Sequence, residues 1–61
     1  MADLTTKELD ALTDQLNYER MMACKYAAAK SDCQGQDLCA TYDRYAQQHR
    51  DNYQSLLNFL K

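Results

Sequence analysis

The feature that most constrains this chain is the helical period of its apolar residues on both sides of its one glycine, Gly35. Residues three and four positions apart share one face of a helix, so each half of the chain predicts a long amphipathic helix. The sequence of 61 residues contains no proline, which would break such a helix. We therefore expect an all-α fold, an antiparallel hairpin of two helices.

Local signals predict where the helices begin and end. Thr5 and Glu8 stand at the N-cap and N3 positions of a capping box, which starts the first helix. Gly35 can adopt the left-handed conformation that often ends a helix. A competing placement uses Ser31 and Gln34 as a second capping box and starts the second helix earlier. The favoured reading is one helical-hairpin domain over residues 1–61, with a helix at about 6–31, a turn at about 32–36 and a helix at about 37–60.

Two polar residues interrupt the apolar stripes at matching levels. Folding the chain about Gln34 places Glu19 of the first helix opposite His49 of the second. Such a pair can form a charge-assisted hydrogen bond that fixes the register of the helices. Alternatively, Glu19 and His49 ligate a divalent metal such as zinc or iron, with Asn52 as a weak third ligand. We expect the structural role, and no cofactor, because Asn52 leaves this ligand set incomplete.

The apolar stripes are too wide for two helices to cover. At the end of the second helix, Leu56, Leu57, Phe59 and Leu60 direct apolar surface to more than one side. A short chain usually buries such a patch against a copy of itself, and two hairpins make a four-helix bundle. We therefore expect a homodimer or a higher oligomer. The expected interface residues are Leu9, Leu12, Leu16, Tyr45, Tyr53, Leu56, Leu57, Phe59 and Leu60.

Composition argues against several functions. The net charge is −2 and the basic residues are scattered, so no nucleic-acid partner is expected. There is no apolar run long enough for a membrane span and no signal peptide, which predicts synthesis in the cytoplasm. His49 has neither a nucleophile nor a cleft beside it, so we do not expect an enzyme. Arg20 and Arg50 are expected to be solvated or paired with Asp14 and Asp51.

The chain has three cysteines, Cys24, Cys33 and Cys39. An odd number argues against a closed disulfide framework, and a reducing compartment keeps thiols free. We therefore expect three free thiols, although Cys33 and Cys39 flank the turn and can pair on oxidation.

Several short motifs carry a resemblance to a known family. They are Leu16-Asn17-Tyr18-Glu19 and Tyr26-Ala27 in the first helix, Gly35-Gln36-Asp37-Leu38 at the turn, and the segment from Tyr45 to Leu56. On these motifs the chain resembles the short ferritin-like helical proteins of the spore coat F type from spore-forming Firmicutes. The resemblance implies half of a ferritin-like four-helix bundle, with a Glu on the first helix and a Glu-x-x-His-like motif on the second. Glu19 matches the former, whereas His49 and Asn52 occupy the latter's two positions with other residue types.

Residue patterns and resemblance together lead to one function hypothesis and two alternatives. We expect a non-enzymatic, self-associating structural protein of the spore coat, with itself and other coat proteins as partners. The first alternative is a metal-binding ferritin-like mini-bundle with Glu19 and His49 as ligands. The second is a helical adaptor that offers a groove to another protein.

Overall fold

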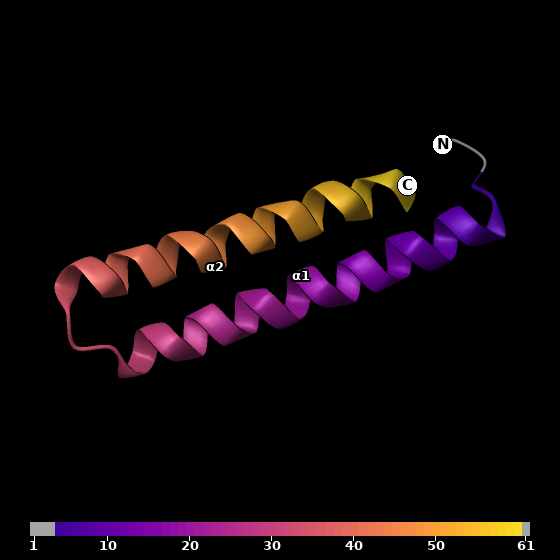
Figure 1. Ribbon diagram of the computed structural model, residues 1–61. Coiled ribbons are helices and arrows are strands. Elements are labelled where there is room, and N and C mark those ends of the chain that lie inside the picture. The colour runs from indigo at the N-terminus through magenta and orange to yellow at the C-terminus, as the bar shows by residue number, and fades with distance from the viewer. Residues whose placement is uncertain (1–3, 61) are drawn as a thin grey trace.

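The computed structural model describes residues 4–60, which form two long helices and one short 3-10 helix. Their bounds are Thr6–Asp32 for α1, Gln36–Leu57 for α2 and Asn58–Leu60 for η1. The long helices lie side by side in opposite directions, so the predicted all-α hairpin is confirmed (Figure 1). Residues 4 and 60 lie at one end of the hairpin and the turn lies at the other (Figure 1). Over the described residues, no helix combines enough length with enough apolar character to cross a membrane.

A complete capping box begins α1, as the sequence predicts. Thr5 Oγ1 accepts a hydrogen bond from the backbone N–H of Glu8 (3.1 Å), and Glu8 Oε1 accepts one from the backbone N–H of Thr5 (3.0 Å). These bonds satisfy N–H groups that the first turn of a helix leaves without partners. They also hold the pKa of the Glu8 carboxyl below its ordinary value, because they favour the charged form.

The turn differs from the predicted one in its backbone. α1 ends at Asp32, and its C-cap residue Cys33 has an extended backbone with φ −77° and ψ 151°. Gly35 is the N-cap of α2 and has φ −82°. The left-handed conformation predicted for Gly35 is therefore wrong, because Gly35 has an extended backbone and begins α2 instead of ending α1. The competing capping box of Ser31 and Gln34 is also wrong, because neither residue caps α2.

Two links tie the helices together near the turn. A disulfide joins Cys33 to Cys39, whose Cα atoms are 5.6 Å apart. The expectation of three free thiols is thus wrong for these two, because the short turn brings the start of α2 beside the end of α1. Cys24 is free and exposed. The second link is an exposed ion pair, with 3.0 Å between Lys30 Nζ and Asp43 Oδ1.

The core of the hairpin is small. The molecule measures 46 × 15 × 11 Å, the dimensions of a single layer of two helices. Its buried apolar residues are Leu16, Ala23 and Ala46, and Glu19 is buried with them. No large side chain among residues 4–60 is fully buried. One layer of helices can cover an apolar stripe only along the line where the two helices touch.

α2 does not turn its whole apolar stripe toward α1. Three residues spaced seven apart lie on the side of α2 that meets α1 or its end. Cys39 is bonded to Cys33, which directly follows α1, Ala46 is 1% exposed, and Tyr53 lines a groove with α1 residues. Leu38 and Tyr45 belong to the apolar stripe as well, but they are 50% and 41% exposed.

Candidate functional site

A buried carboxylate lies at the centre of the contact between the helices. Glu19 is 6% exposed, and three side chains place a hydrogen-bond donor on its oxygens. His49 Nδ1 lies 2.6 Å from Oε1, Gln15 Nε2 lies 2.8 Å from Oε2, and Asn52 Nδ2 lies 3.4 Å from Oε1. Burying a carboxylate is costly unless its oxygens are bonded in this way. We call Gln15, Glu19, His49 and Asn52 the polar cluster.

These hydrogen bonds fix the charge of Glu19. The bond to His49 holds the pKa of the Glu19 carboxyl below its ordinary value, although burial acts in the opposite direction. Glu19 is therefore ionised at neutral pH, and a carboxylate can only accept hydrogen bonds. Nδ1 of His49 consequently carries a hydrogen and donates it to Glu19.

Helical spacing explains why the polar cluster forms. Gln15 precedes Glu19 by four residues, which places both on one face of α1. His49 and Asn52 are three residues apart and share one face of α2 in the same way. Glu19 lies opposite His49, as the predicted register requires.

Tyrosine rings enclose the imidazole of His49. Tyr26 stacks on it with 5.8 Å between ring centroids and 4° between ring planes, and Tyr18 meets it edge-on at 6.1 Å and 82°. Tyr26 also contacts Tyr42 and Tyr45, with centroid distances of 5.9 and 5.2 Å. Tyr26 and Tyr42 are eight residues on either side of Gln34, so the fold about Gln34 that pairs Glu19 with His49 also brings these two tyrosines together. The His49 side chain is 20% exposed, so the polar cluster is shielded without being closed.

Glu19 and His49 are in direct contact in this structure, as a hydrogen-bonded pair. Zinc lies about 2.0–2.2 Å from each nitrogen or oxygen ligand, so Nδ1 and Oε1 of a shared ion would be more than about 3 Å apart. Their separation of 2.6 Å is that of a direct charge-assisted hydrogen bond. Between residues 4 and 60, no group of three or more His, Cys, Asp and Glu residues could hold a metal ion.

The expected interface residues differ in how much of each the hairpin itself covers. Leu16 is buried within the hairpin. The half-buried residues are Leu12, Tyr53, Leu56 and Leu57. The exposed ones are Leu9, Tyr45, Phe59 and Leu60. The last group leaves apolar surface exposed on the hairpin.

Apolar side chains form a column along one side of α2 and η1. Leu38, Tyr45 and Phe59 are 50%, 41% and 62% exposed, and their numbers follow a seven-residue repeat whose remaining member is Asn52. Seven residues make about two helical turns, so residues at this spacing lie on one side of a helix. We call Leu38, Tyr45, Asn52 and Phe59 the exposed column.

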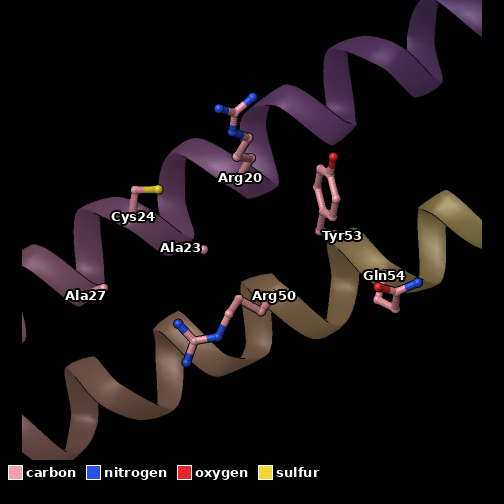
Figure 2. A pocket seen from close by; sticks show the side chains of 7 residues that line it. All are labelled: Arg20, Ala23, Cys24, Ala27, Arg50, Tyr53 and Gln54. Carbon is pink, nitrogen blue, oxygen red and sulfur yellow. The ribbon is translucent and has the colours of Figure 1, made fainter.

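A groove of about 370 Å³ runs between the helices on another side (Figure 2). Arg20 and Arg50 stand at its edges, and Figure 2 shows their guanidinium groups pointing away from each other. Tyr53 extends from α2 toward α1 at one end (Figure 2). We call this surface the arginine groove. Its lining residues are Arg20, Ala23, Cys24 and Ala27 of α1 and Arg50, Tyr53 and Gln54 of α2.

Helix geometry places the groove and the exposed column on opposite sides of the hairpin. Arg20 follows Glu19 by one residue, and Arg50 follows His49 by one residue. One residue rotates a helix by about 100°, and in an antiparallel pair this step turns both helices toward the same side. Tyr18 precedes Glu19 and therefore lies on the other side. Leu38, Tyr45 and Asn52 likewise each precede a residue on the side of α2 that meets α1 or its end. Those residues are Cys39, Ala46 and Tyr53.

Sequence reasoning missed the role of Gln15 and the arginine groove. The spacing of four residues between Gln15 and Glu19 is the signal that could have found the first. Arg50 Nη2 donates to Gln47 Oε1 at 3.1 Å, and neither groove arginine lies within 4.0 Å of a carboxylate in the described part of the chain. Both arginines are exposed, so of the two alternatives predicted for them the solvated one is observed and the pairing with aspartates is not.

No family model matches the chain, and neither a curated protein nor a solved structure matches it.

Proposed function

We propose that the protein is a non-enzymatic structural module that dimerises through the exposed column into a ferritin-like four-helix bundle. The column itself carries this proposal. Leu38, Tyr45 and Phe59 repeat at the interval by which helices pack against one another. In the single hairpin Leu38 and Phe59 are 50% and 62% exposed, and Tyr45 remains 41% exposed beside Tyr26. In a dimer, the exposed column of each hairpin would cover that of the other.

The small core of the hairpin supports the same proposal. A chain of this length rarely stabilises its fold with a core as limited as Leu16, Ala23 and Ala46. Each half-exposed side chain of the column that becomes covered contributes roughly 1 kcal/mol. Six such side chains in a symmetric dimer therefore add a contribution comparable to the total stability of a small domain.

The polar cluster gives this dimer a defined register. Asn52 belongs both to the exposed column and to the polar cluster, because its side chain donates to Glu19. A polar residue within an apolar column disfavours slipped pairings, in which it would be buried without a partner. Glu19 and His49 would then lie next to the interface as a structural pair.

The biological role in this proposal is that of a spore-coat protein, assembled with itself and with other coat proteins. Its support is the resemblance of the sequence motifs to the spore coat F type. A coat is built from many copies in contact, and a hairpin that leaves apolar columns uncovered suits such repeated association.

Metal binding is the second candidate. The observation that favours it is the direct contact between Glu19 and His49, two residue types that ligate zinc and iron. Dimerisation through the exposed column would bring two copies of this pair toward one core. An ion would have to replace the hydrogen bond within each pair.

Sedimentation equilibrium and elemental analysis on one sample test both candidates. The wild-type protein should be a dimer or higher oligomer at micromolar concentration, without stoichiometric metal. Tyr45→Glu with Phe59→Glu should give a monomer of lower helicity. Met21→Glu is the matched control, because Met21 is 60% exposed but lies outside the column, and it should leave the mass unchanged.

The opposite outcomes are equally clear. A stably folded wild-type monomer over the whole concentration range would contradict the structural proposal. Stoichiometric zinc or iron that is lost in Glu19→Gln and in His49→Gln would favour the metal-binding bundle instead.

A further inference from the structure

We propose that the arginine groove binds an amphipathic helix of another protein, with carboxylates on the flanks of its apolar stripe. The first support is charge. Arg20 and Arg50 stand at the edges of the groove, and over residues 4–60 neither has a carboxylate within 4.0 Å. The one recorded bond of Arg50 goes to the neutral amide of Gln47. Both guanidinium groups are thus available to carboxylates, with which they form strong paired hydrogen bonds.

The shape of the groove suits a helix. Ala23 and Ala27 are one turn apart and form its floor, and their small side chains let another helix approach closely. The α1 part of the groove, from Arg20 to Ala27, extends about 10 Å along the axis at 1.5 Å per residue. An apolar stripe in such a groove, with anchors on successive turns, is a recurrent mode of peptide recognition.

The orientation of the arginines favours a helix over a small anion. Figure 2 shows the two guanidinium groups pointing apart, so they do not converge on one phosphate or carboxylate. A helix carries side chains on both flanks of its apolar stripe and can place one carboxylate near each edge of the groove. The partner is therefore recognised by carboxylates in two rows, with small or aliphatic residues between them.

A second copy of this chain fits the groove poorly. A symmetric dimer places the same surface of both subunits in contact, which would bring Arg20 and Arg50 toward the same arginines of the partner. Like charges facing each other disfavour that pairing. Self-association through the exposed column uses the other side of the hairpin and leaves one groove open on each copy. The inference therefore goes beyond the proposed dimer and does not depend on it.

Fluorescence anisotropy with synthetic peptides tests the inference on the full-length chain. The probe is a labelled helical peptide of about four turns, with an alanine and leucine stripe flanked by glutamates. Its matched control has glutamine at every glutamate. We expect the glutamate peptide to bind at least tenfold more tightly than the glutamine peptide, and its affinity to fall as salt is added.

Three protein variants locate the site. Arg20→Gln with Arg50→Gln should weaken binding of the glutamate peptide at least tenfold. Ala27→Trp should abolish binding by filling the floor, and it should leave the melting temperature unchanged because Ala27 is exposed. Arg44→Gln removes an exposed arginine outside the groove and should leave affinity unchanged.

Several results overturn the inference. They are equal affinity for the two peptides, undetectable binding of the glutamate peptide at millimolar concentration, and unchanged affinity in Arg20→Gln with Arg50→Gln. The remaining possibility is that a second copy of the chain occupies the groove, and sedimentation of Arg20→Gln with Arg50→Gln without peptide tests it. Loss of the wild-type oligomer would assign the groove to a second copy and overturn the inference, whereas an unchanged mass supports it.

Discussion

The ring of Tyr26 lies parallel to the imidazole of His49, with 5.8 Å between their centroids and 4° between their planes. Tyr26 belongs to α1 and His49 to α2, so this stack joins the two helices. On its edge, the same imidazole donates to Glu19, another α1 residue. A ring face and a carboxylate thus fix the orientation of His49 together, within one hairpin and before any partner binds.

The contact between Glu19 and His49 should be measurable as coupling between the two positions. Glu19→Gln should destabilise the protein by about 1–3 kcal/mol, because it replaces a charge-assisted hydrogen bond and perturbs the other donors. In a double-mutant cycle measured by urea denaturation, Glu19→Gln with His49→Gln should cost less than the sum of the single changes. Gln48→Ala, an exposed change beside His49, should stay within about 0.5 kcal/mol of wild type. Strictly additive effects would mean that the contact does not form.

Stability should fall on acidification, and Glu19 should account for part of the loss. The pKa of Glu19 in the fold is lowered from an ordinary value of 4.5, so the unfolded chain takes up this proton first as the pH falls. The contribution of Glu19 is therefore complete above pH 4.5 and is lost as the pH falls through its lowered value. Urea denaturation from pH 6 down to pH 3 should show a shallower loss for Glu19→Gln than for wild type.

A control separates this effect from that of a second carboxyl. The pKa of Glu8 is also lowered by its capping bonds to Thr5. Glu8→Gln should remove its own share of the acid dependence and leave the share of Glu19. An acid profile identical in wild type and Glu19→Gln would show that Glu19 makes no contribution.

Reduction of the disulfide should weaken the hairpin without unfolding it. Closing so short a loop restricts the unfolded chain by about 2 kcal/mol. Cys33→Ser with Cys39→Ser should therefore lower the melting temperature by about 10 °C and retain the helical circular dichroism spectrum. Cys24→Ser, which changes the free thiol, should melt as wild type does. A cooperative loss of helicity on adding reductant would instead make the disulfide essential to the fold.

The sequence predicted those parts of the fold that depend on local patterns. The capping box of Thr5 and Glu8 placed the start of α1, and the spacing of the stripes placed Glu19 opposite His49. The sequence did not predict which of two neighbouring columns of residues on α2 faces α1. Leu38 and Tyr45 directly precede Cys39 and Ala46 and have the same seven-residue spacing, so pattern alone did not decide which pair faces α1.

The disulfide shows why that choice was not accessible from pattern. Cysteine pairing depends on the distance between two residues in the folded chain and on the redox conditions, neither of which a helical period contains. The bond between Cys33 and Cys39 sets which side of the first turn of α2 lies toward the end of α1.

The backbone conformation of Gly35 allows the turn between α1 and α2 to accept other residues. Its φ of −82° lies in the extended region, which residues other than glycine also adopt. A Cβ added at this position would contact only the Cβ of Leu38, at an ordinary van der Waals distance of 3.8 Å. No position in the connection therefore demands glycine. A foreign peptide inserted between Cys33 and Gly35 would be closed into a loop by the disulfide and displayed at the end opposite residues 4 and 60 (Figure 1). The hairpin is thus a ready scaffold for presenting constrained loops.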